Sequence, residues 1–208
     1  MAKEHRAKLL SNNSPLTGLL GGAAGGALIT AFANKKSARK LLKAGGLVAL
    51  GGVAWHAYRS YKDGAGKDDV ETAALPKERF DEVAAGTDAD STLLVQAMIA
   101  AAHADGHLDD SERERIWRLA MEQGSSPEEL ATLGYQIQHP WTIDQLAEAA
   151  DSFELKMEIY TVSLVILEGN TTCDGYLDTL AQKLALPRGL VLTLNRQFEG
   201  DSDRIEAA

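Results

Sequence analysis

The chain has 208 residues, of which 45% are hydrophobic and 25% are charged, so it holds enough apolar material for at least one globular core. Its single cysteine excludes an intrachain disulfide and any zinc or redox motif built on paired cysteines. The net charge of −9 is unevenly placed: residues 1–62 hold ten basic side chains and one acidic one, whereas residues 63–208 hold 11 basic and 29 acidic ones. The acidic part disfavours nucleic acid as a partner, because Lys and Arg supply the affinity for phosphate, and the basic part suits an anionic lipid surface.

Residues 1–62 contain two Gly-rich apolar runs, which predict a membrane-associating region. The first run, residues 16–33, is uncharged, and as a helix it would be about 27 Å long, just enough to cross the core of a bilayer. The second run, residues 41–58, has one charge near its start and carries Trp55 near its end, as expected at a membrane interface. A basic segment, residues 34–40, separates the two runs. The sequence therefore predicts one membrane segment or a hairpin of two.

The glycines of the first run are spaced four apart, at Gly18, Gly22 and Gly26. This spacing lets two helices approach closely in a membrane and permits self-association, whereas in water each glycine costs a helix about 1 kcal/mol. Two alternatives stay open. In the first alternative, the run is a Gly-rich leader that is either disordered or lies on a surface. In the second, it is a signal peptide that is cleaved after Ala-Phe-Ala at residues 31–33.

Residues 63–90 are rich in Gly, Asp, Ala and Thr and predict a flexible acidic linker, and residues 91–200 predict an all-α domain of about seven helices. Strand alternation is absent from this part of the sequence. The helices are expected over residues 93–101, from Ser111 to a stop at Gly124, from the capping box 126–129 to Pro140, from the capping box 142–145, over residues 153–167 and 177–184, and from Pro187 onward. The segment 153–167 is apolar on all sides, which is typical of the central helix of a bundle.

Three stretches of the sequence carry a family resemblance. Residues 101–116, in which an apolar helix is followed by Ala-Asp-Gly and an acid-rich helix start, resemble the first signature of TerB-like (tellurite-resistance) domains. Residues 158–160 and 176–187 resemble the second half of such a domain. The basic residues 34–42 between two Gly-rich runs resemble the YebE-like inner-membrane proteins, a family of unknown function with a TerB-like tail. The resemblance implies an all-helical fold and association with the inner membrane, and it brings no catalytic activity.

The resemblance also implies a divalent-metal site, because TerB-like domains consist of two related halves with acidic residues proposed to bind a metal. In the second half, Cys173 occupies a position where an acid is expected. The candidate ligands are Asp105, Asp109 and Glu112 in the first half and Glu168 and Asp174 in the second.

The residues themselves offer two other interpretations of this region. Asp109 and Glu112 fit the cap and first turn of a helix, where acids stabilise the N-terminus. His103 and His107, four residues apart and followed by Glu112, would form the zinc site of a hydrolase only if the helix continued through Gly106.

These patterns predict a non-enzymatic, membrane-anchored module at the bacterial inner membrane. Its acidic helical domain is expected to bind another protein, or to sense a divalent cation or a stress. The alternatives are a soluble or secreted helical binding domain after removal of a leader, and a metal-dependent hydrolase. The side of the membrane that holds the domain and the oligomeric state are left open.

Overall fold

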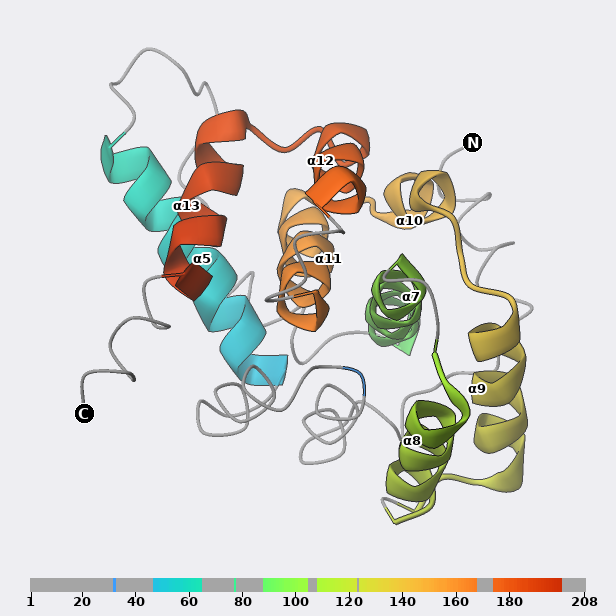
Figure 1. Cartoon of the computed structure of the whole chain (residues 1–208). Helices are drawn as coiled ribbons and strands as arrows, with labels where there is room; N and C mark the ends of the chain where they lie inside the picture. The colour runs from blue at the N-terminus through green and yellow to red at the C-terminus, as the bar shows by residue number, and fades with distance from the viewer. Residues whose placement is uncertain are drawn as a thin grey trace.

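The computed structural model describes residues 47–64, 88–104, 108–122, 124–167 and 174–199, together with the single residues Phe32 and Lys77. These residues form eight α-helices and no strand, which confirms the predicted all-α class (Figure 1). The helices are α5 (Leu47–Gly64), α7 (Asp88–Ala104), α8 (Asp110–Glu122), α9 (Pro127–Gln138), α10 (Ile143–Ala149), α11 (Phe153–Ile166), α12 (Asp174–Lys183) and α13 (Arg188–Glu199).

Several helix ends follow from local sequence signals. Before α9, the Ser126 hydroxyl accepts a hydrogen bond from the Glu129 backbone N–H, and the Glu129 carboxylate accepts one from the Ser126 N–H at 2.7 Å. Thr142 and Gln145 make the same reciprocal pair before α10, so both predicted capping boxes are confirmed. Gly124, the predicted stop after α8, has a φ of 82°, a left-handed conformation that glycine adopts without strain.

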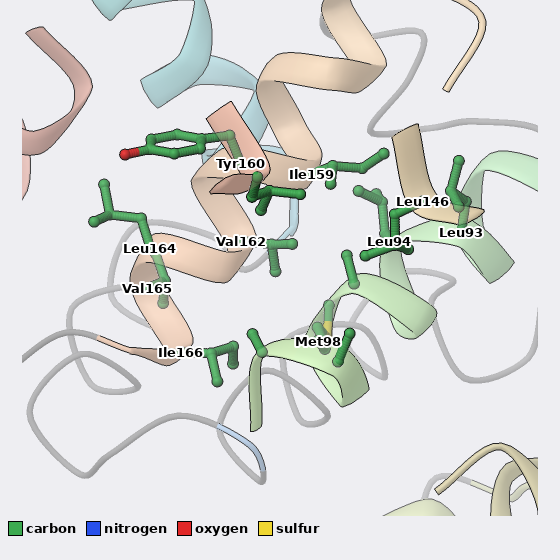
Figure 2. Packing of buried hydrophobic residues seen from close by; sticks show 14 of the residues in the cluster. Leu93, Leu94, Met98, Leu146, Ile159, Tyr160, Val162, Leu164, Val165 and Ile166 are labelled. Carbon is green, nitrogen blue, oxygen red and sulfur yellow. The ribbon is translucent and has the colours of Figure 1, made fainter. Parts of the chain in front are cut away.

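Helix α11 lies at the centre of the bundle, as its sequence predicted, because 12 of its 14 residues are buried. Val162 and Ile166 point toward α7, where they meet side chains such as Met98 (Figure 2). On another side of α11, the Tyr160 hydroxyl donates a hydrogen bond to the side-chain oxygen of Asn195 in α13 at 3.0 Å. Helices on several sides are therefore needed to cover α11.

Helix α5 packs against α11 and α13 and belongs to the same hydrophobic core. Tyr58 meets the ring of Phe153 edge-on, with 5.9 Å between the ring centroids. The Gln197 side-chain amide of α13 donates to the Val53 carbonyl and accepts from the Ala57 N–H, each at 3.2 Å. These contacts place the end of the second apolar run inside the bundle.

The described helices cross the boundaries that the sequence predicted for the linker. Helix α5 begins within the run 41–58 and ends at Gly64, and α7 begins at Asp88. Apart from Lys77, the residues between these helices lie outside the described part of the chain, as does the run 16–33 apart from Phe32, which is buried in the core.

The described helices differ from membrane-spanning helices. None of them combines the length and hydrophobicity of a membrane-spanning helix. The membrane segment or hairpin therefore stays a prediction.

We expect Gly189 to be required for the close packing of α13 on α5. A Cβ atom at this position would lie 2.7 Å from Cε2 of Tyr61. Gly189→Val should therefore lower the free energy of unfolding by about 1–3 kcal/mol through overpacking, measured by chemical denaturation.

The control is Gly175→Val, at the equivalent second position of α12, where a Cβ atom would meet nothing within 4 Å. Both substitutions carry the same helix-propensity cost, so their difference isolates the contact with Tyr61. Equal unfolding free energies for the two variants would contradict the packing described.

Candidate functional site

The most unusual chemical group of the described core is the carboxyl of Glu158, in the middle of α11. Glu158 is 1% exposed, and Glu154, one turn earlier on the same helix, is 3% exposed. Their positions four residues apart place both carboxyls on one side of α11. Carboxylates are rarely buried in this way, because removing the charge from water costs free energy unless the group is paired or neutralised.

The environment of Glu158 favours its neutral form. Burial, together with the negative charges of Asp90 and Glu154, raises the pKa of Glu158 from its ordinary value to about 9, and burial is the largest of these causes. One oxygen of its carboxyl, Oε1, has no hydrogen-bond partner among the described residues. At neutral pH Glu158 is therefore a protonated acid that can donate a hydrogen bond or release a proton.

Two buried hydroxyls of α11 differ from the Glu158 carboxyl because they are satisfied within the helix. The Thr161 hydroxyl donates to the Met157 carbonyl at 2.7 Å, and the Ser163 hydroxyl donates to the Ile159 carbonyl at 2.8 Å. These bonds are made within the helix and need no ligand. Unlike these two hydroxyls, the Glu158 carboxyl has one oxygen without a partner among the described residues.

Two buried glutamines add to the unpartnered polar groups of the interior. Gln96 in α7 and Gln136 in α9 are 0% and 2% exposed, and neither side-chain amide forms a hydrogen bond with the described part of the chain. Each such group costs about 1–3 kcal/mol. A core with polar groups that lower its stability is typical of proteins in which those groups serve a function.

His103, a candidate in the hydrolase interpretation, links two helices in the structure. Its Nε2 atom lies 2.8 Å from the carbonyl oxygen of Ile137, in the last turn of α9. This hydrogen bond joins the end of α7 to the end of α9. His107, its proposed partner, lies outside the described residues.

Asp109 and Glu112, candidates for the metal site, form the N-terminal cap of α8. The Glu112 N–H donates to Oδ1 of Asp109 at 2.7 Å, and the Asp109 N–H donates to Oε2 of Glu112 at 3.2 Å. This is the arrangement of a capping box, with Asp in place of Ser or Thr. The helix-cap interpretation therefore accounts for both residues.

The remaining metal candidates are not placed by the structure. Asp105 and Glu168 lie outside the described residues, and Asp174 begins α12 with a side chain that is likewise outside them. In the ranges that are described, no group of three or more His, Cys, Asp or Glu side chains could hold a metal ion. The full five-residue set thus stays a prediction.

Glu154 and Glu158 were not among the site residues predicted from the sequence. A signal was present: two acids four residues apart, with Lys156 between them, interrupt a segment that is otherwise mostly apolar. Because the hydrophobicity of the segment predicted a central helix, an acid within it was expected to lie in or near the core. Asp90 carried no such signal, because it lies in the range predicted as a linker.

A family profile described as "Protein of unknown function (DUF533)" matches residues 15–198. No curated protein and no solved structure matches the chain.

Glu158 should make the stability of the protein depend on pH. Between its ordinary pKa near 4.5 and its folded pKa of about 9, the folded protein holds a proton that the unfolded chain has lost. Stability should therefore fall as pH rises through this window, by up to about 1.4 kcal/mol per pH unit, and level off above it. Glu158→Gln should remove this slope in unfolding measured from pH 5 to pH 9.

Glu122→Gln, at the exposed end of α8, is the matched control and should keep the wild-type slope. If Glu158→Gln and the wild type lose stability equally over this range, the carboxyl is not held in a neutral, buried state.

Proposed function

The chain belongs to the DUF533 family, and from this premise we propose that it is a non-enzymatic helical module that attaches to the bacterial inner membrane and binds another protein through its acidic bundle. The observation that carries the proposal is the division of the sequence into two unlike parts. Residues 1–62 are basic and hold both apolar runs, whereas residues 63–208 are strongly acidic. If both parts of the chain were surrounded by water, this separation of basic from acidic residues would have no explanation.

The N-terminal part supports attachment to a bilayer. Its first run has no charge over residues 16–33, and Lys and Arg flank it on both sides. Basic side chains near a membrane are attracted to anionic headgroups, each by about 1 kcal/mol. The finer assignment to YebE-like proteins with a TerB-like tail agrees with this arrangement and is part of the proposal.

The helical part supports a binding role. Exposed on its surface are large apolar side chains on two neighbouring helices, Met121 of α8 and Tyr135 of α9, at 57% and 61% exposure. Tyr135 stacks on His139 with 4.3 Å between the ring centroids, so its orientation is fixed before a partner arrives. Rigid aromatic side chains of this kind are favourable anchors in protein interfaces.

Binding of a protein is favoured over sensing of a divalent cation. Asp109 and Glu112 already accept hydrogen bonds from each other's backbone, so a metal would compete with the cap of α8. His103 likewise has a partner in the Ile137 carbonyl, which gives the hydrolase interpretation no support.

Membrane attachment is tested by placing a charge in the middle of the first run. The wild-type chain, expressed in bacteria, should stay with the membrane fraction after washing with high salt. Ala24→Asp should move the protein toward the soluble fraction, because a charge at the centre of a bilayer-spanning helix costs about 2.5–3.5 kcal/mol.

Ala74→Asp, in the range predicted as a linker, makes the same change of charge outside the apolar runs and should leave the distribution unchanged. A wild-type protein found in the soluble fraction would reject the proposal. If mass spectrometry then gave Asn34 as the mature N-terminus, the leader alternative would replace it.

A further inference from the structure

Helix α5 has one face in the core and another that is aromatic and basic. The core face consists of Ala54, Ala57 and Tyr58, which are between 0% and 4% exposed. Trp55 and Arg59, one turn apart, lie on another side of the helix, where Trp55 is half-buried and packs against the edge of the core and Arg59 is exposed. The helix can therefore stay packed in the bundle while the second face contacts something else.

The side chains of this second face form an ordered cluster. The Arg59 guanidinium lies over the indole of Trp55, 5.4 Å from the ring centroid, and the exposed His56 ring meets the indole edge-on at 5.0 Å. Arg59 also pairs with Asp63 at 3.8 Å, but both side chains are largely exposed, and such ion pairs contribute little. The guanidinium thus has capacity for a stronger anionic partner.

The chemistry of the cluster matches a phospholipid headgroup. Tryptophan is enriched at the level of the headgroups, where its ring is in apolar surroundings and its N–H is hydrated. Arginine binds phosphate with two parallel hydrogen bonds. The combination is therefore complementary to a surface that presents phosphate above an apolar layer.

The position of α5 along the chain and in the bundle agrees with this partner. The helix begins inside the second apolar run and lies almost wholly within the basic part of the sequence, residues 1–62, so an anchor in residues 1–46 would hold α5 next to the bilayer. In Figure 1, α5 lies at one side of the bundle and α8 and α9 lie at the opposite side. A bilayer at α5 would leave α8 and α9 accessible.

We propose that the Trp55–Arg59 face of α5 rests on anionic phospholipid headgroups and orients the bundle on the membrane, with α8 and α9 turned away from it. This inference rests on the proposed membrane attachment and adds the contact surface, the lipid class and the orientation.

The test uses the full chain in vesicles of anionic phosphatidylglycerol or neutral phosphatidylcholine, each with brominated acyl chains that quench nearby tryptophans. Flotation of the vesicles is scored first, because it reports on attachment alone. The fluorescence of the floated protein is then compared between the wild type and Trp55→Phe, which keeps the other two of the three tryptophans. We expect quenching in anionic vesicles that Trp55→Phe abolishes.

The role of the guanidinium is tested with Arg59→Gln. In anionic vesicles, this variant should lower the equilibrium constant for contact between the α5 face and the membrane about fivefold. The quenching of tryptophan fluorescence should fall accordingly. Arg118→Gln is the matched control, because Arg118 is 60% exposed and also forms an i,i+4 pair, with Glu114, on the opposite side of the bundle. It should leave the quenching unchanged.

The outcomes separate the two proposals. A protein that does not float with either vesicle overturns the membrane attachment and this inference with it. A protein that floats but shows equal quenching in the wild type and Trp55→Phe keeps its anchor and overturns the orientation. Equal losses from Arg59→Gln and Arg118→Gln overturn the assignment of the lipid contact to this face.

Discussion

The burial of α11 along almost its whole length is the constraint on which the rest of the structure depends. A helix without a solvated face needs neighbours on every side, and α5, α7, α12 and α13 all contact it. This requirement explains why a helix from the N-terminal part of the chain, α5, is drawn into the bundle. It also explains why Glu158 cannot reach water, because the helix offers no exposed side to which its carboxyl could turn.

Two unusual features belong to the same bundle. The carboxyl of Glu158 is buried inside it, and the basic face of α5 lies at one side of it. Glu158 and the buried glutamines lower stability, since one carboxyl oxygen of Glu158 and both amide atoms of each glutamine have no partners among the described residues. The hydrophobic contacts of α7 and α11 compensate for them, as the packing of Met98 and Val162 illustrates (Figure 2). The fold therefore tolerates these groups without relying on them for its stability.

Much of the fold could be predicted from the sequence, because its signals are local. Ser126, Thr142 and Gly124 identified helix ends through side-chain caps and backbone freedom, which depend on a few neighbouring residues. The candidate site could not be predicted in the same way. The burial of Glu158 depends on which helices surround α11, and the packing of α5 depends on Gly189 and Gln197, more than 120 residues further along the chain. The hydrophobicity of residues 41–58 predicted a membrane-associating run, whereas the structure packs Ala54, Ala57 and Tyr58 of that run in the core of the bundle, because apolar side chains suit either environment.

Hydrogen–deuterium exchange of the full chain in lipid-free solution tests the central claim, that α5 is an integral part of the bundle around α11. Backbone amides in residues 53–61 should be protected together with those of α11 and should exchange with them in one cooperative opening. Exchange of residues 53–61 at the rate of an unstructured peptide, with α11 still protected, would contradict it. That result would mean that another part of the chain covers α11.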